Sequence, residues 1–260
     1  MSAMSDGRSE FAESPFGAPT PLPEPRTSTS SLISREAEID QLRRFLGGEA
    51  DARCLIILGE PGIGKTCLWE AGIAIADQLG YVVLTARASE AEAALSFAAL
   101  GDLVGRIGHD VLPTLPPPQR HALEVALRIV DPMGIPPDAL AISAGLLSAL
   151  RTLSEQHRVL IAIDDLQWLD PSSADPILFA ARRLAGENVR LLLSRRPGRA
   201  STLEKTLQPV GVEHVELAGL SVGAISRLLS DRLDLVLPRR ELRGVRRTWE
   251  ERFPELSHAA

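Results

Sequence analysis

The chain is poor in cysteine, lysine and aromatic residues, and it has no long apolar run. Its two cysteines, Cys54 and Cys67, fall in predicted core elements, which argues against a disulfide framework and favours a reduced, cytoplasmic protein. No apolar run approaches the roughly 20 residues of a membrane-spanning helix, and the N-terminus lacks the basic and apolar segments of a secretory signal. We therefore expect no membrane partner.

The net charge is also small. It is −6 over 260 residues, with acidic and basic side chains interspersed, so the chain has no general attraction to nucleic acid. Of the 28 basic residues only Lys65 and Lys205 are lysines. Apolar residues make up 45% of the chain, enough for a buried core, and the length suits one α/β domain with a smaller piece.

The first 31 residues differ in composition from the rest. Residues 1–31 are rich in Ser, Thr, Pro, Gly and Glu and contain few apolar side chains. Such a segment cannot bury enough surface to offset the entropy of ordering, so it is predicted to be a disordered tail. The remainder is predicted to form a larger domain over 32–218 and a smaller piece over 219–260.

Apolar runs alternate with helical patterns along the remainder. Short apolar runs, typical of strands covered on both faces, lie at 54–59, 81–86, 159–163, 189–194 and, alternating and edge-like, 212–217. Helical periodicity covers 35–46, 66–79, 96–107, 119–130, 138–156, 173–185 and 221–233. The proline-rich segment 112–118 is predicted to be a rigid surface connection. The alternation predicts an α/β fold with a doubly wound parallel sheet of about five strands.

One segment, GEPGIGKT at 59–66, has the pattern Gly-x-x-x-x-Gly-Lys-Thr between an apolar strand and a helix, the context of a P-loop. Its glycines let successive backbone N–H groups point at one anion, and the start of the helix adds unpaired donors. Lys65 is expected to reach the β- and γ-phosphates of ATP, and Thr66 to place its hydroxyl on Mg²⁺. A chance match is the alternative, at roughly one or two per thousand such sequences. The predicted nucleotide-binding residues here are Gly59, Glu60, Pro61, Gly62, Ile63, Gly64, Lys65, Thr66 and Cys67.

Two acids, Asp164 and Asp165, end the apolar run at 159–163. Ligand sites form at the carboxyl edge of a parallel sheet, and buried acids are costly unless they have partners or a role. Asp164 is expected to hold Mg²⁺ through water, and Asp165 to orient or deprotonate the attacking water; a solvated strand end is the alternative. The spacing of about 100 residues from Lys65 predicts that strand 81–86 lies between the P-loop strand and the Asp strand, a layout typical of proteins that hydrolyse ATP.

The run at 189–194 ends in Ser194 and is followed by Arg195 and Arg196. Its end is predicted to lie beside the γ-phosphate, where a polar or positively charged side chain can respond to that group. We favour Arg196 for this role, and a surface position for both arginines is the alternative. Cys67 would lie in the first turn of a helix, where a thiolate is favoured, although a small core residue is the simpler interpretation.

Four segments together resemble a known family: ISREAE (33–38), GEPGIGKT (59–66), IAIDDLQWLDPSS (161–173) and LLLSRRPG (191–198). They look like the ATPase module of the large ATP-binding LuxR-type transcriptional regulators of actinobacteria. That module belongs to the signal-transducing ATPases with numerous domains, within the AAA-related superfamily. The resemblance covers roughly residues 32–237.

The resemblance implies a switch in which ATP or ADP sets the arrangement of a P-loop domain and a helical lid, followed by a helical-repeat sensor and a DNA-binding helix-turn-helix. It also implies that Arg35 and Glu36 lie near the adenine and ribose. Trp168 and Asp170 match the family's motif after the paired acids, with Trp168 interpreted as core packing. Ser34 replaces the family's usual glycine with another small residue.

The resemblance ends near Leu237. The family continues its lid into a glycine-asparagine-proline element, whereas this chain reads PRRELRGVRRTWEERFPELSHAA over 238–260. We therefore expect only the start of a helical lid, and a foreign or out-of-frame ending that docks weakly. Five arginines between 239 and 247 could form a nucleic-acid patch, but a solvated terminal helix is the simpler interpretation.

Three functions stay open on this sequence. The first is a signalling switch that binds ATP or ADP with Mg²⁺ and hydrolyses ATP slowly. The second is a module that binds nucleotide without useful turnover, and the third is a remnant of a truncated regulator. Direct nucleic-acid binding by this chain is not expected, while self-association or an unidentified protein partner is compatible with all three.

Overall fold

The computed structural model describes residues 34–107, 111–132, 137–184, 186–198, 202–233, 235, 237–238, 240–242 and 244. The tail predicted at 1–31 and most of the ending at 238–260 lie outside these residues. Within that ending the side chain of Leu242 is only 2% exposed, and weak docking of the ending stays a prediction.

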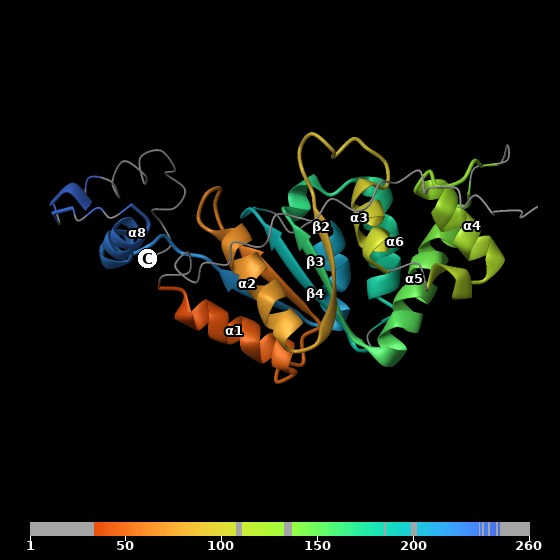
Figure 1. Ribbon diagram of the computed structural model, residues 1–260, viewed down its shortest axis with the longest axis horizontal. Coiled ribbons are helices and arrows are strands. Elements are labelled where there is room, and N and C mark those ends of the chain that lie inside the picture. Colours follow the sequence, from red (N-terminus) through yellow and green to blue (C-terminus); the bar gives the residue numbers. More distant parts are fainter. Residues whose placement is uncertain are drawn as a thin grey trace, which may run out of the picture.

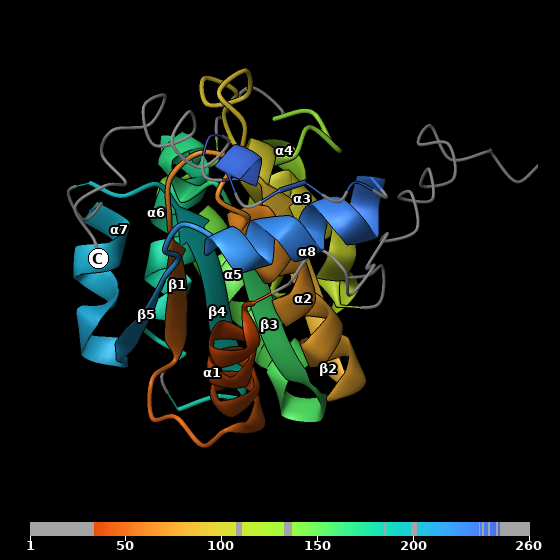
Figure 2. The ribbon, with the colours of Figure 1, turned by 90° about the vertical axis from the view of Figure 1, so that its left-hand side faces the viewer.

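A parallel sheet of five strands forms the centre of the molecule, in the order β2-β3-β4-β1-β5. This confirms the predicted α/β fold. Strand β5 lies at one edge of the sheet, beside β1, as its alternating pattern predicted (Figure 2). The strands are β1 (Cys54–Leu58), β2 (Tyr81–Arg87), β3 (Arg158–Asp164), β4 (Val189–Arg195) and β5 (Val212–Glu216).

The predicted strand order was wrong in one respect. A strand does lie between the P-loop strand β1 and the Asp strand β3, but it is β4 and not β2, which lies at the far edge. The burial of the two strands agrees with this order, since every residue of β4 is buried, whereas four of the seven in β2 are partly or fully exposed. Spacing along the chain did not reveal this, since helical crossovers let a parallel strand pair away from its chain neighbour.

Helices cover both faces of the sheet (Figures 1 and 2). One face packs against α1 (Glu36–Gly47) and α2 (Lys65–Gln78), and α8 (Val222–Leu233) lies on the same side. The other face packs against α3 (Ala98–Ile107), α5 (Ala139–Gln156), α6 (Pro171–Ala181) and α7 (Thr202–Leu207), with α4 (Pro117–Ala126) against α5. Among the described residues, no helix has both the length and the apolar character needed to cross a membrane.

Strand β1 shows why the central strands are apolar throughout. Successive side chains of a strand point to opposite faces, so Leu55 and Ile57 join the core under α1 and α2. Cys54 and Ile56 join the core on the other face. Because both faces are covered, neither set can be polar without loss of burial.

The segments that differ from the predictions are short or contain proline. The proline-rich segment is no plain connection, since Leu112–Thr114 form a 3-10 turn and α4 already begins at Pro117. Proline suits the first turn of a helix, where its missing N–H costs nothing. Helix α7 and the 3-10 turns Leu166–Trp168 and Gln208–Val210 were not predicted, because elements of six or three residues carry too little periodicity.

Candidate functional site

The P-loop is the turn between β1 and α2, and two of its glycines have conformations that favour glycine. Gly62 and Gly64 have φ angles of 78° and 104°. Gly59 is required for space, since a Cβ there would lie 2.6 Å from the Ile63 side chain and 3.2 Å from Leu217 Cβ. The Gly59 N–H also donates to the Arg195 carbonyl at 3.3 Å, which ties the start of the loop to β4.

Helix α2 begins with donors that its own side chains leave free. Its N-cap is Gly64, no side chain caps it, and no acidic residue lies in its first turn. Helix α6 shows the contrast, because its N-cap Asp170 accepts a hydrogen bond from Ser173 N at 2.8 Å. The first N–H groups of an α-helix have no partner within the helix, so the start of α2 fits an anion such as a phosphate.

Lys65 stands at this helix start, and its side chain lies in the loop. The residue is 6% exposed, and Nζ donates to the Glu60 carbonyl at 3.0 Å. Burial lowers the pKa of Lys65, the negative charge of Asp165 opposes that effect, and the positive charge of Arg196 adds to it. The ammonium therefore lies close to Asp165 and Arg196 and donates to an uncharged acceptor, the Glu60 carbonyl. A bound phosphate would stabilise its charged form.

Thr66, Asp164 and Ser194 form one hydrogen-bonded cluster at the carboxyl ends of β3 and β4. Thr66 Oγ1 donates to Asp164 Oδ2 at 2.9 Å, and the Ser194 hydroxyl hydrogen bonds with Asp164 Oδ1. Asp164 is 5% exposed, and burial of a carboxyl group is costly without such hydrogen-bond partners. The structure thus brings together the two residues predicted for Mg²⁺, and hydroxyl and carboxylate oxygens are the ligands this cation prefers.

Asp165 turns away from the strand that ends at Asp164. It has a φ of 53°, in the left-handed region, and its N–H donates to Ser194 Oγ at 3.0 Å. Its carboxylate accepts a hydrogen bond from Gln167 Nε2 at 2.8 Å. The half-buried acid is therefore held beside the Asp164 cluster, separate from the pair that would bind the cation.

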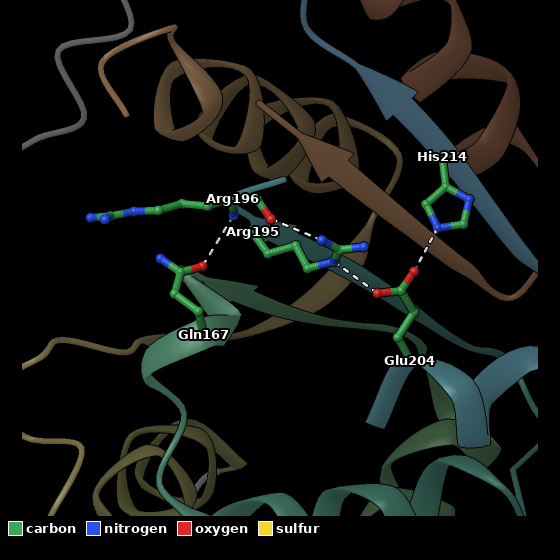
Figure 3. A network of polar contacts seen from close by, with 5 residues as sticks. All are labelled: Gln167, Arg195, Arg196, Glu204 and His214. Carbon is green, nitrogen blue, oxygen red and sulfur yellow. Dashed lines mark hydrogen bonds and ion pairs between the residues drawn. The ribbon is translucent and has the colours of Figure 1, made fainter. Parts of the chain in front are cut away.

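The two arginines after Ser194 point in different directions (Figure 3). Arg195 is buried at 7% exposure, and its Nε pairs with Glu204 Oε2 at 2.7 Å, so a surface position for Arg195 is wrong. Arg196 is exposed, with its guanidinium 5.7 Å from the centroid of the half-buried Trp168 ring. Of these two arginines, Arg196 is therefore the one whose side chain is free of the buried pair and exposed.

Glu204 is buried and contacts both Arg195 and the exposed His214. Its other oxygen lies 2.9 Å from His214 Nε2 of β5 (Figure 3). Burial, the largest single influence, would raise the pKa of Glu204. Hydrogen bonds with Arg195 and His214, together with their charges, outweigh burial, so the pKa lies below its ordinary value.

Arg35, at the start of α1, contacts the P-loop. It is 7% exposed, and its guanidinium donates to the Ile63 carbonyl at 3.5 Å and the Ala218 carbonyl at 2.7 Å. It also pairs with Glu38 at 2.8 Å. Arg35 therefore connects the P-loop with the segment between β5 and α8, and its contact with adenine or ribose stays a prediction. Cys67 is half-buried in the first turn of α2.

Several functional contacts were not predicted from the sequence. Asp170, matched only through a motif, accepts from Phe97 N at 2.9 Å and Ala99 N at 3.3 Å, and so holds the start of α3. Gln167 and Glu204 were not singled out at all. The sequence carried no signal for Glu204, because this residue lies in a short segment without helical periodicity. Gln167 could have been found as an amide two residues beyond the paired acids.

The sequence profile described as AAA ATPase domain matches residues 31–193, which include the P-loop and both acids. No curated protein matches the chain. The solved E. coli MS115-1 HORMA:CdnC:Trip13 complex is similar at 15% identity with a TM-score of 0.50, covering 86% of this chain and 76% of that chain. This similarity is one of fold alone.

Two other solved structures have lower TM-scores. AMPPCP-bound DnaA from Aquifex aeolicus has 15% identity and a TM-score of 0.47, covering 82% of this chain and 56% of that one. Drosophila ORC bound to DNA has 20% identity and a TM-score of 0.47, covering 87% and 52%. This chain spans little more than half the length of these two. Because the AAA profile matches more than half of the chain, and the P-loop and paired acids within it adopt the geometry described above, the protein belongs to the AAA ATPase domain family.

Proposed function

We propose that this chain is the ATP-binding switch module of a LuxR-type regulator, acting in the cytoplasm and hydrolysing ATP slowly. One observation carries the nucleotide site. The uncapped start of α2, the Lys65 ammonium and the Thr66–Asp164 pair converge at the carboxyl edge of one sheet. Each of these features fits one part of a nucleotide–Mg²⁺ complex.

The binding step assigns a role to each feature. The N–H groups at the start of α2 would receive phosphate oxygens, and Lys65 would exchange its contact with the Glu60 carbonyl for a phosphate. Thr66 and Asp164 would hold Mg²⁺, which when bound supplies positive charge against the phosphate oxygens. Arg35 would transmit the state of the loop to the segment before α8, since it donates to carbonyls on both sides.

The hydrolytic step depends on Asp165 and Arg196. Asp165 would accept a proton from the attacking water or orient it, and Arg196 would stabilise the charge that develops on the γ-phosphate. Arg196 and Gln167 are exposed. This edge of the site is therefore open to water, and an open site supports slow turnover.

Binding is tested with the only two lysines of the chain. Lys65→Ala should abolish the rise in unfolding temperature that ATP–Mg²⁺ gives to the wild type, because a ligand bound only by the native state stabilises it. Lys205→Ala, in an exposed position of α7, is the matched control and should keep the full rise. If ATP–Mg²⁺ raised the unfolding temperatures of Lys65→Ala and wild type equally, the proposed phosphate site would be wrong.

The regulator role is tested by the coding DNA. Helical repeats and a helix-turn-helix encoded with this module, in the same frame or a shifted one after codon 237, would support a LuxR-type regulator. A neighbouring domain of another kind would leave the nucleotide site in place and overturn the regulator role.

A further inference from the structure

We propose that Gln167 is a positioning residue that holds the Asp165 carboxylate and the Arg196 backbone in a fixed relation. The proposal rests on the proposed function, because that function makes Asp165 the group that handles the attacking water. It goes further by naming the side chain that aims the carboxylate.

Both polar atoms of the Gln167 side chain are engaged. Nε2 donates to Asp165 Oδ1 at 2.8 Å, and Oε1 accepts from Arg196 N at 3.2 Å. Figure 3 shows the second contact across the end of β4. The orientation of the amide is determined by its partners, because exchanging its two atoms would set NH₂ against an N–H and a carbonyl against a carboxylate. A glutamine is therefore specifically suited to this position.

The partner at Arg196 is itself immobilised. The Arg196 carbonyl accepts from the Arg195 guanidinium at 2.8 Å, and Arg195 is fixed by its buried pair with Glu204 (Figure 3). The peptides on both sides of the Arg196 Cα are thus hydrogen bonded, one through its N–H and one through its C=O. Gln167 also starts from a fixed backbone, since its neighbour Leu166 is 5% exposed in the 3-10 turn.

The contact matters because a free aspartate carboxylate rotates readily. The χ2 angle of aspartate is broad and roughly two-fold, so the backbone alone does not aim the two oxygens. A donor on Oδ1 sets the plane of the group and leaves Oδ2 in a defined direction. Gln167 therefore couples the end of β3, which carries Asp165, to the end of β4, which carries Arg196.

Two substitutions separate the contacts. Gln167→Met keeps the length of the side chain and removes both hydrogen bonds. Gln167→Glu keeps an acceptor for the Arg196 N–H and replaces the donor to Asp165 with a repelling carboxylate. Both should lower kcat for phosphate release by roughly 5- to 50-fold, because a small misplacement of a reacting group costs up to about a hundredfold.

The readouts must distinguish aiming from folding. The Kd for a non-hydrolysable ATP analogue with Mg²⁺ and the unfolding temperature should stay close to wild type in both variants. In an Asp165→Asn background, Gln167→Met should cause no further loss of rate, since the group that it aims is already disabled. Gln78→Met, at the exposed end of α2 away from the P-loop, is the control for a surface glutamine and should keep the wild-type kcat.

The outcomes separate this inference from the function on which it rests. If wild type releases phosphate and Gln167→Glu keeps its kcat, the positioning role is wrong and the ATPase stands. An equal loss from Gln167→Met in the wild-type and Asp165→Asn backgrounds also overturns the role. If wild type itself releases no phosphate, the proposed hydrolysis fails, and the role of Gln167 fails with it.

Discussion

Thr66 Oγ1 lies 2.9 Å from Asp164 Oδ2, so the start of α2 and the end of β3 meet in one hydroxyl–carboxylate contact. The two residues are 98 positions apart in the chain. Their contact exists only because β3 lies two strands from β1 in the sheet, with β4 between them. Substitutions at Thr66 and Asp164 therefore test the predicted Mg²⁺ site.

The first prediction concerns the hydroxyl of that pair. Thr66→Val keeps the shape of the side chain and removes its oxygen, so Mg²⁺-dependent ATP affinity should fall on the order of tenfold to hundredfold, as for a lost bond to a charged group. Thr66→Ser keeps the hydroxyl and should remain within a few fold of wild type. Titrations with and without Mg²⁺ measure the effect, and an unchanged Mg²⁺ dependence in Thr66→Val would remove Thr66 from the cation site.

The second prediction separates the two acids. Asp164→Asn should weaken Mg²⁺-dependent nucleotide binding, because it removes charge from a buried cluster that would face the cation. Asp165→Asn should leave binding intact and lower phosphate release by roughly 10²- to 10⁴-fold, the range for a general base. Direct binding and phosphate-release assays on both variants check this. Wild-type hydrolysis by Asp165→Asn would show that Asp165 does not handle the water.

These two predictions rest on residues that the sequence could identify and on a geometry that it could not. The P-loop and paired acids were readable because each motif depends on neighbouring residues between a strand and a helix. The contact of Arg196 with Gln167 depends on β3 and β4 being neighbours, and the pairing of Arg195 with Glu204 depends on where α7 packs. The sequence had placed strand 81–86, not β4, between β1 and β3, and helix α7 was not predicted, so neither contact could be derived.

The third prediction concerns the space around Gly59. A methyl group there would lie 2.6 Å from the Ile63 side chain, so Gly59→Ala should displace the P-loop, weaken ATP binding and cost about 1–3 kcal/mol of stability through overpacking. Gly105→Ala, in helix α3, is the matched control, because nothing lies within 4 Å of its added Cβ. That control should raise stability by about 0.5–1 kcal/mol, since alanine favours helix over glycine. Chemical denaturation measures both, and a neutral Gly59→Ala would contradict the tight packing of the loop.

The last prediction concerns Glu204 and pH. The pKa of Glu204 is lowered in the folded protein, because bonds and charges from Arg195 and His214 outweigh its burial. A carboxylate with a depressed folded-state pKa stabilises the fold fully above its unfolded-chain value of about 4.3, and loses that contribution as the pH falls through the lower folded value. Glu204→Gln should therefore cost roughly 3 kcal/mol at pH 7, as expected for a broken buried ion pair.

The difference in unfolding free energy between wild type and Glu204→Gln should shrink as the pH is lowered through about 4.3 and below, because Glu204 becomes protonated there whereas the glutamine at this position does not titrate. Urea denaturation at several pH values measures this difference. Glu216→Gln, at an exposed position on β5, is the control and should differ little from wild type at any pH. A Glu204→Gln deficit that stays constant down to pH 3 would show that the pair stabilises the fold through packing and hydrogen bonding, and that the carboxylate charge contributes little.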